Sequence, residues 1–403
     1  MTERLYYTDP YMREFEAEVV GVERLEDGRR AAILNRTAFY PTSGGQPFDT
    51  GMLGALRVVD VVDREGDGAI LHVVEGEPAL GPTRAFIDWG RRFDHMQQHT
   101  GQHVLSAAFD RLQKVRTVSF HLGTVSSTID LAREVTPSEI AAAEAEASRV
   151  VWDDIPVSIR FAESADVAKM SLRKESVREG VMRLIEIEGI DLSACGGTHV
   201  SRTGVIGNIA VASWEKFRGG MRIEFVCGGR ALAAYRLLRD SVAESVQKLS
   251  ISAQELPAGI DRLQSDAKDL KRQLKGMQSR LASFEADALA SRAESRGPLR
   301  VVIEALEGWD QNGLKLIASA IVTRPAHVAV LVGSQSPAFV VVARSADSSV
   351  NAADVLKELT TKFGGKGGGR PELAQGGGLT APPAELVEAA RKSTALIGPT
   401  TAA

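Results

Sequence analysis

Cysteine is scarce in this 403-residue sequence, which contains only Cys195 and Cys227. Two thiols cannot build a disulfide scaffold, so each is available for metal binding or for packing. Long apolar runs are also missing, since no segment approaches the ~18 residues that span a membrane. The N-terminus lacks the basic start and apolar core of a secretory signal. We therefore expect a cytoplasmic protein with no membrane partner.

An excess of positive charge is absent as well, because 48 basic residues face 52 acidic ones and the formal net charge is −4. This balance argues against a protein that coats nucleic acid indiscriminately, but it leaves room for a local basic patch. The composition, 44% hydrophobic and 25% charged, is typical of a globular protein. A chain of this length predicts two or three domains rather than a single core.

Residues 1–88 have the pattern of a small β-barrel or sandwich, with short alternating segments between Gly, Asp and Pro clusters. These segments are Phe15–Val22, Arg30–Leu34, Arg57–Val62 and Ile70–Val74. From Asp94 the apolar spacing becomes helical, and residues 89–229 mix strand and helix signals. A helix is expected to begin after Thr136, a suitable N-cap with Glu139 three residues on.

Residues 230–296 are rich in Ala, Leu, Arg, Lys, Glu and Gln, which favours long helices. Pro257 separates this segment into two halves. An approximate heptad rhythm is kept by Leu263, Leu270, Leu274 and Leu281. A helical hairpin, a solvated spacer and a dimerising coiled coil all fit this pattern, so a homodimer through residues 230–296 is an open prediction.

Residues 297–403 predict a compact α/β unit. The runs VVIEAL, AHVAVLVG and AFVVVAR have the character of buried strands, and helices are predicted at Gln311–Val322 and Ala352–Lys362. The unit ends in a glycine-rich stretch, FGGKGGGRPELAQGGG. The chain as a whole is therefore expected to be α+β, with an N-terminal β-barrel, a mixed core, a helical spacer and a C-terminal α/β domain.

Three histidines, His95, His99 and His103, follow each other at intervals of four residues. On a helix they share one face, and any adjacent pair is spaced to hold one metal ion. For an isolated histidine, a polar contact with solvent or RNA is the commoner explanation. Three in register, in a chain with only seven histidines, favour a metal site.

A second cluster of potential ligands is the segment Ala194–His199, which reads ACGGTH. A thiolate and an imidazole four residues apart, with two glycines between them, can bend back onto one ion. Sulfur and imidazole nitrogen together suit zinc better than magnesium or calcium. Four protein ligands are typical of a closed structural zinc, so the spacing alone slightly favours a structural site over a catalytic one.

These motifs are recognisable. HTGQHVLSAAF (99–109), ACGGTHVSRTGVIG (194–207) and the loop TAFYPTSGGQPFDTG (37–51) resemble the editing domain of alanyl-tRNA synthetase and the long free-standing alanyl-tRNA editing proteins. The stretch GGKGGGRPELAQGGG (364–378) resembles the C-terminal, DHH-associated domain of the same synthetases. The synthetases carry their aminoacylation domain ahead of the editing region, and this sequence begins at the small β domain. ATP-dependent charging of tRNA is therefore not expected.

Carried over residue by residue, the resemblance implies that the zinc ligands are His99, His103, Cys195 and His199. It leaves His95 outside the ligand set, as a polar neighbour on the same helix face. It also places His121 and Thr128 near positions that form the family's editing pocket. These two residues are therefore candidate catalytic residues.

The resemblance also supplies candidates for substrate or tRNA contact, namely Gly44, Gly45, Gln46, Arg183, Lys366 and Arg370. The first three would allow the acceptor end of tRNA to approach closely, although a tight turn in the β domain explains them equally well. The last two lie in the glycine-rich stretch, which would either cradle phosphates or form a flexible loop.

The implied function is zinc-dependent hydrolysis of alanine tRNA mischarged with serine or glycine. A pocket sized for alanine rejects these amino acids by only ~1–3 kcal/mol, whereas an editing site that hydrogen-bonds the serine hydroxyl would refuse alanine. Zinc would either activate water or the carbonyl, or mainly orient the substrate, and both mechanisms stay open. The alternative is a tRNA-binding module with a structural zinc and no hydrolysis.

Overall fold

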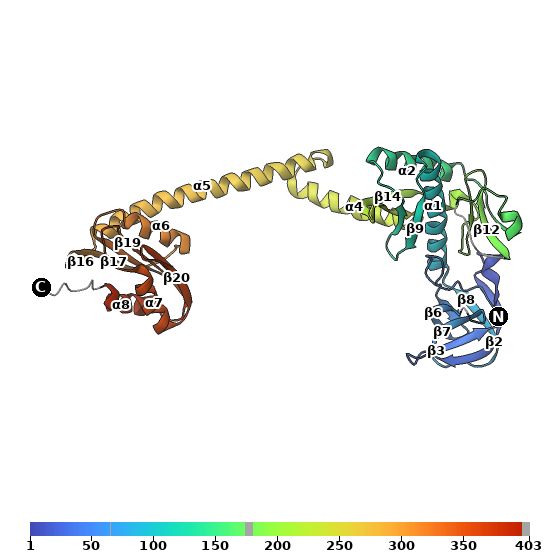
Figure 1. Cartoon of the computed structure of the whole chain (residues 1–403), viewed down its shortest axis with the longest axis horizontal. Coiled ribbons are helices and arrows are strands. Elements are labelled where there is room, and N and C mark those ends of the chain that lie inside the picture. The colour runs from blue at the N-terminus through green and yellow to red at the C-terminus, as the bar shows by residue number, and fades with distance from the viewer. Residues whose placement is uncertain (65, 174–179, 397–403) are drawn as a thin grey trace. The chain divides into compact units, whose positions relative to one another are not determined.

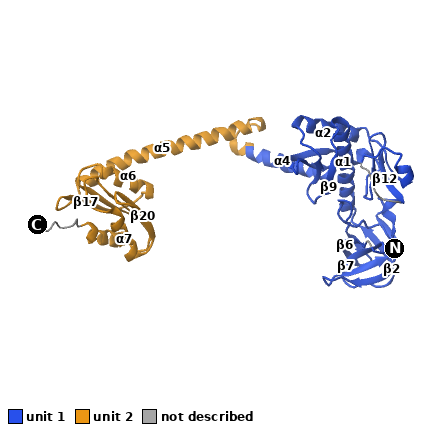
Figure 2. Ribbon diagram, viewed as in Figure 1, with its two compact units in different colours: residues 1–245 blue, residues 246–403 orange. Residues whose placement is uncertain are grey.

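The computed structural model describes residues 1–64, 66–173 and 180–396 (Figure 1). Its described part contains several β-sheets and eight α-helices, so the predicted α+β class is confirmed. The chain divides into two compact units, residues 1–245 and 246–403 (Figure 2). The finer division at residues 88, 229 and 296 stays a prediction. Within the described ranges, no helix has the length and apolar character needed to cross a bilayer.

The N-terminal segment forms a closed barrel in the strand order β2-β3-β7-β6-β5-β8. Along β2, Phe15, Ala17 and Val19 are buried while the residues between them are exposed, which is the alternation of a strand with one face on a core. The barrel strands are β2 (Glu14–Arg24), β3 (Arg30–Leu34), β5 (Gly51–Leu53), β6 (Leu56–Arg64), β7 (Ala69–Glu75) and β8 (Gly81–Ile87). Beside them, β1 (Glu3–Arg4) pairs with β4 (Arg36–Thr37).

Helix α1 (Trp89–Gln113) follows the barrel directly and is buried along most of its length. It begins at Asp88, whose side chain accepts a hydrogen bond from the backbone N–H of Arg91. Near its start, Arg92 forms a fully buried ion pair with Asp49 of the preceding β segment. The guanidinium of Arg92 also donates to the Pro10 and Ala38 carbonyls. These bonds attach α1 firmly to the barrel segment.

Two antiparallel sheets complete the first unit. One has the order β14-β15-β10-β9 and packs with α1 and α2, and the other has the order β11-β12-β13. The elements are β9 (Thr117–Leu122), β10 (Ser127–Leu131), α2 (Pro137–Trp152), β11 (Val157–Glu163), α3 (Ser164–Val167), β12 (Val181–Ile187), β13 (Asp191–Ala194), β14 (Ile209–Phe217) and β15 (Gly220–Cys227). The predicted helix start is confirmed, because Thr136 and Glu139 form a reciprocal capping box on α2.

Gly101 lies where α1 meets β15, and a methyl group there has no room. A Cβ atom at this position would lie 2.2 Å from Sγ of the buried Cys227. We therefore expect Gly101→Ala to lower the free energy of unfolding by about 1–3 kcal/mol in urea denaturation. The control is Gly276→Ala, whose Cβ would meet no atom within 4 Å, and which should stabilise its helix by ~1 kcal/mol. Equal stability of Gly101→Ala and wild type would contradict this packing.

The segment predicted as a spacer consists of two helices, α4 (Gly228–Leu249) and α5 (Leu256–Ser291). Pro257 stands in the first turn of α5, where a missing backbone N–H costs nothing. The heptad leucines of α5 are more than half exposed: Leu263, Leu270, Leu274 and Leu281. Only the end of α5, with Ala282, Ala286 and Leu289, is buried against the following sheet.

The second unit contains a mixed sheet in the order β16-β17-β18-β19-β21-β20. The end of α5 and α6 pack on one face, and α7 and α8 on the other. The elements are β16 (Glu294–Arg296), β17 (Leu299–Leu306), α6 (Gln311–Ile321), β18 (His327–Gly333), β19 (Ala338–Arg344), α7 (Ala352–Phe363), β20 (Lys366–Arg370), β21 (Leu373–Leu379) and α8 (Pro383–Arg391). The buried strands and helices predicted for this segment are confirmed.

Candidate metal centre

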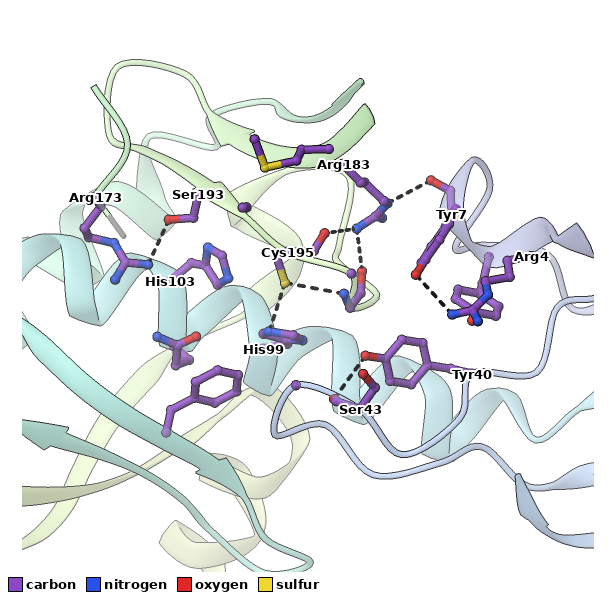
Figure 3. A pocket seen from close by; sticks show the side chains of 18 of the residues that line it. Arg4, Tyr7, Tyr40, Ser43, His99, His103, Arg173, Arg183, Ser193 and Cys195 are labelled. Atoms are coloured by element: carbon purple, nitrogen blue, oxygen red, sulfur yellow. Dashed lines mark hydrogen bonds between the residues drawn. The ribbon is translucent and has the colours of Figure 1, made fainter. Parts of the chain in front are cut away.

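Four potential metal ligands converge in the first unit. Helix α1 carries His99 and His103 one turn apart, and the loop after β13 carries Cys195 and His199. One ligand atom from each residue lies within 4.8 Å of the other three. Sγ of Cys195 lies 3.4 Å from Nε2 of both His99 and His199. The fold thus brings together the four predicted ligands, with Cys195 and His99 lying 96 residues apart in sequence. Figure 3 shows three of them, His99, His103 and Cys195.

The Nδ1 atom of His99 donates to Oε1 of Gln46 at 2.8 Å, and that of His103 donates to Oδ2 of Asp191 at 2.7 Å. Such partners fix the ring orientation and the tautomer of metal-binding histidines.

The third imidazole is held in the same way. Nδ1 of His199 lies 3.2 Å from Oγ1 of Thr100. The Thr100 hydroxyl gives its own hydrogen to the Met96 carbonyl, so its oxygen accepts from the ring N–H. With a metal bound, all three rings would therefore carry their proton on Nδ1 and present the Nε2 lone pair to the ion. This arrangement, with one sulfur and three imidazole nitrogens, fits a zinc-type metal ion.

The glycines of the CGG segment are needed for room rather than for unusual backbone angles. The sequence suggested that they permit a bend, but neither Gly196 nor Gly197 has a positive φ. A Cβ at Gly197 would instead lie 2.1 Å from Cε1 of His99. The loop can therefore approach the His99 ring closely only with glycine at position 197.

The surroundings of the cluster favour a thiolate at Cys195 and a neutral imidazole at His199. Burial by itself raises the pKa of the Cys195 thiol, but the neighbouring His99, His199 and His103 bring it well below its usual value. Burial, and then repulsion from His99, lowers the pKa of His199 to about 3. Burial also lowers the pKa of His103, but the hydrogen bonds and charges of Asp191 and Cys195 together outweigh it and raise the pKa to about 9. Because metals bind the thiolate, the surroundings prepare the sulfur for a cation.

A pocket of about 560 Å³ lies against one side of the cluster. His99, His103 and Cys195 contribute to its wall, whereas His199 is not among the described residues that line it. The rest of the wall comes from the barrel segment, from β9 and from the segments that carry Arg173, Arg183 and Ser193 (Figure 3). An open space beside three of four ligands is what a reactive site needs and what a purely structural zinc does not.

Two family models match the chain. The first, the threonyl and alanyl tRNA synthetase second additional domain, matches residues 182–224, and the DHHA1 domain matches residues 299–395. The alanyl-tRNA editing protein AlaX-L of Pyrococcus horikoshii is 31% identical over 406 residues, which cover 97% of this chain and 98% of that protein. The chain belongs to the alanyl-tRNA editing protein family.

Alanine–tRNA ligases are similar to this editing-family chain over part of their length. That of Methanoregula boonei is 34% identical over 394 residues, which cover 94% of this chain and 42% of the ligase. That of Methanoculleus marisnigri is 36% identical over 94% of this chain and 41% of the ligase. The solved C-Ala domain of the Aquifex aeolicus alanyl-tRNA synthetase is 26% identical and covers 25% of this chain and 95% of that domain, with a TM-score of 0.23.

In this member of the editing family, the loop of residues 37–51 contacts the four-residue cluster directly. Gln46 is fully buried, and its side chain binds His99 together with the backbone N–H and hydroxyl of Thr198. A Cβ at Gly45 would lie 2.8 Å from the Phe120 ring, so this glycine lets the loop lie on β9. Gln46 thus positions a ligand from inside the protein, and its predicted contact with tRNA stays a prediction, while Gly44 lines the pocket.

Replacing Gln46 should weaken metal binding. Gln46→Leu removes the acceptor for the His99 ring N–H, and we expect zinc affinity to fall by about 10–100-fold in competition with a chelator. Gln46→Glu keeps an oxygen in that place and should retain most of the affinity. If Gln46→Leu binds zinc as tightly as the wild type, this side chain does not position the ligand.

His121 and Thr128 do not join the cluster. They are register partners on β9 and β10. The ring of Phe120 lies 5.3 Å from the His99 ring, so the adjacent His121 points to the opposite face of the sheet. Neither residue is among the described side chains that line the pocket. Their catalytic role stays a prediction that this geometry does not favour.

His95 lies one turn before His99 on α1 and takes no part in the cluster. It is 3% exposed, and its Nδ1 atom has no hydrogen-bond partner among the described residues. Burial lowers its pKa to about 4, followed by the effect of Arg91, so the ring is neutral at physiological pH. The structure agrees with its exclusion from the ligand set.

The predicted glycine-rich loop is a β-hairpin in the second unit. Lys366 and Arg370 stand at the two ends of the exposed edge strand β20, which pairs with β21. A Cβ at Gly367 would lie 2.5 Å from Cα of Gly376, so the glycines allow the two strands to pair closely. Both cations remain exposed, which keeps them available to a phosphate backbone.

Sequence reasoning missed two residues that hold the ligands, Asp191 and Thr100. A metal-binding histidine usually donates its second ring N–H to a carboxylate or another oxygen. Each predicted ligand therefore implied an acceptor, and Asp191 stands four residues ahead of Cys195. The sequence carried no indication of which acceptor would meet which ring.

Proposed function

We propose that this chain binds zinc through His99, His103, Cys195 and His199 and hydrolyses the aminoacyl ester of alanine tRNA mischarged with serine or glycine. The observation that supports it most strongly is the pocket beside three of the four ligands. Membership of the alanyl-tRNA editing family supports the same reaction class. Zinc bound here supplies Lewis acidity at the wall of the pocket.

The chain's own residues hold the site in place. Gln46, Asp191 and Thr100 orient the three imidazoles, and Arg183 binds the carbonyls of Cys195 and Gly197. These bonds fix the geometry before substrate enters, so little reorganisation is needed during the reaction.

Recognition of serine requires a polar contact near the cluster. Gln102 and Thr117 line the pocket, and both of their side chains donate to Oγ of Ser106. We propose that this polar wall binds the serine hydroxyl. Beyond their bonds to Ser106, both side chains keep oxygen lone pairs that could accept from the serine hydroxyl, a hydrogen bond that alanine cannot make.

Deacylation of alanine tRNA tests the proposal. Zinc-loaded protein should release serine from seryl-tRNA and leave alanyl-tRNA intact, which is measured by acid precipitation of labelled aminoacyl-tRNA. No release of serine or glycine at micromolar enzyme would overturn the hydrolase. If tRNA binding and zinc persist in that case, the chain is a binding module whose four protein ligands complete a structural site. The exposed Lys366 and Arg370 would then still contribute to tRNA affinity.

Helix α5 carries the proposed homodimer contact. Its heptad leucines are more than half exposed, and Met277 and Phe284 are exposed near them. We expect the full chain to sediment as a dimer and the double variant Leu270→Glu with Leu274→Glu to sediment as a monomer. Arg272→Glu, a charge change on the side of the same helix opposite the heptad leucines, should leave the dimer intact. A monomeric wild-type chain would remove this idea.

A further inference from the structure

Arg183 differs from the other two arginines that line the pocket. Arg4 pairs with Asp63 at 2.8 Å, and Arg173 pairs with Asp191 at 2.6 Å. Arg183 is 8% exposed and forms no ion pair with a carboxylate of the described residues. A buried charge of this kind is costly unless something compensates it.

The hydrogen bonds of Arg183 go only to neutral oxygens. Its Nε donates to the Tyr7 carbonyl at 2.9 Å, and its Nη1 donates to the carbonyls of Cys195 at 2.6 Å and Gly197 at 3.0 Å (Figure 3). Three bonds leave the guanidinium little freedom to turn. Its head group is therefore held at a defined place next to the cysteine of the cluster.

One of the two terminal nitrogens of the Arg183 guanidinium makes no hydrogen bond within the described part of the chain. Nη2 of Arg183 is buried and has no hydrogen-bond partner among the described residues. The same is true of the hydroxyl of Tyr6, which lines the same pocket and lies near the charge of Arg4. Buried donors are rarely left unpaired in native proteins, so two of them on one pocket indicate a missing acceptor.

The charge of the pocket indicates that the acceptor is an anion. Among the described residues, Cys195 is the anionic group that acts most strongly on the Arg183 guanidinium, and its charge is offset when it binds a divalent cation. Asp63 and Asp191 are already engaged by the other two arginines. With a metal ion in the cluster, the described residues on this side of the pocket carry net positive charge. A guanidinium edge in such a place favours phosphate oxygens.

We propose that Nη2 of Arg183 and the hydroxyl of Tyr6 form a phosphate subsite for the terminal nucleotide of the substrate. The proposal rests on the proposed function, which places the acylated ribose at the cluster. Arg183 is bonded to the carbonyl of Cys195 itself, so the subsite adjoins the reacting ester. One nucleotide carries its ester and its 5′-phosphate on the same ribose, and it can therefore occupy both sites at once.

A calorimetric comparison of two probes tests the subsite without requiring hydrolysis. Adenosine 5′-monophosphate and adenosine are titrated into the full-length, zinc-loaded protein. The wild type should bind the phosphorylated probe about tenfold or more tightly. Arg183→Gln should bring the two affinities close together. Tyr6→Phe, which removes only one hydroxyl, should lower the ratio about fivefold and leave adenosine binding unchanged.

The control removes Arg4, an arginine whose charge is already paired with a carboxylate. Arg4→Gln combined with Asp63→Asn deletes a complete ion pair from the same pocket, so the affinity ratio should stay at the wild-type value. A ratio near one in the wild type, or an unchanged ratio in both Arg183→Gln and Tyr6→Phe, overturns the subsite. Failure to bind either probe also overturns it.

Hydrolysis of small esters shows whether Arg183 binds the phosphate or the ester carbonyl of the substrate. Arg183→Gln should slow hydrolysis of 3′-seryl adenosine 5′-monophosphate about tenfold more than that of 3′-seryl adenosine, because both reactions lose the bonds that hold the Cys195 loop and only the first loses the phosphate contact. An equal loss with both esters means that Arg183 acts through the Cys195 loop or on the ester carbonyl, and it overturns the phosphate subsite. Inactivity of the wild type toward every ester contradicts the proposed function alone, because the binding ratio is measured independently.

Discussion

Cys195→Ala is expected to lose both zinc and deacylation. The substitution removes the only sulfur of the cluster and leaves three imidazoles, so zinc affinity should fall by more than the ~10–100-fold typical of partners outside the coordination sphere. Deacylation of seryl-tRNA should fall to background, while most of the tRNA affinity remains. Zinc content by atomic absorption and the rate of serine release measure the two effects.

The second cysteine provides a matched control. Cys227 is fully buried on β15 beside Gly101, away from the four ligands, and burial raises the pKa of its thiol. Cys227→Ala should therefore keep one zinc per chain and keep the activity, with some loss of stability from the cavity. Full activity in Cys195→Ala would exclude the cluster as the active site.

Asp49→Ala is expected to cause the largest loss of stability. Asp49 and Arg92 are both fully buried, and the substitution leaves the guanidinium without a counter-charge. It also removes the acceptor for the backbone N–H of Tyr40. Breaking one partner of a buried pair costs about 3–5 kcal/mol, so the free energy of unfolding in urea should fall by this amount.

An exposed ion pair in the same barrel shows how much burial matters. Glu14 and Arg84 pair at 2.9 Å, but both side chains are more than half exposed. Glu14→Ala should change stability by less than ~1 kcal/mol, because water screens such pairs. If Asp49→Ala costs no more than Glu14→Ala, the Arg92 guanidinium finds other compensation and the buried pair does not hold α1 to the barrel.

Local patterns in the sequence were sufficient for most of the secondary structure. Alternation located the strands β2, β3, β6 and β7, and the apolar spacing located α1, α6 and α7. These signals work because the side-chain period of a strand or helix is set by its own backbone. The glycine-rich stretch was harder, since glycine is compatible with a loop and with the closely paired hairpin that is observed.

The two histidines of α1 and the CGGTH segment were predicted as one site from spacing and family resemblance, and the structure brings them together. The residues that form hydrogen bonds with these ligands could not be predicted from spacing. Gln46 lies 53 residues from His99, and Asp191 lies 88 residues from His103. No periodicity relates such positions.

The sequence by itself therefore determined most of the helices and strands, the four candidate metal ligands and the family. Only the tertiary structure decided that Gln46 serves a histidine, that His121 turns away from the cluster, and that Arg183 keeps one unused edge beside Cys195. Arg183 reaches the Tyr7 carbonyl across 176 residues of sequence. The physical reason is that hydrogen bonding and burial depend on which distant segments pack together, whereas helix and strand periods depend on neighbours along the chain.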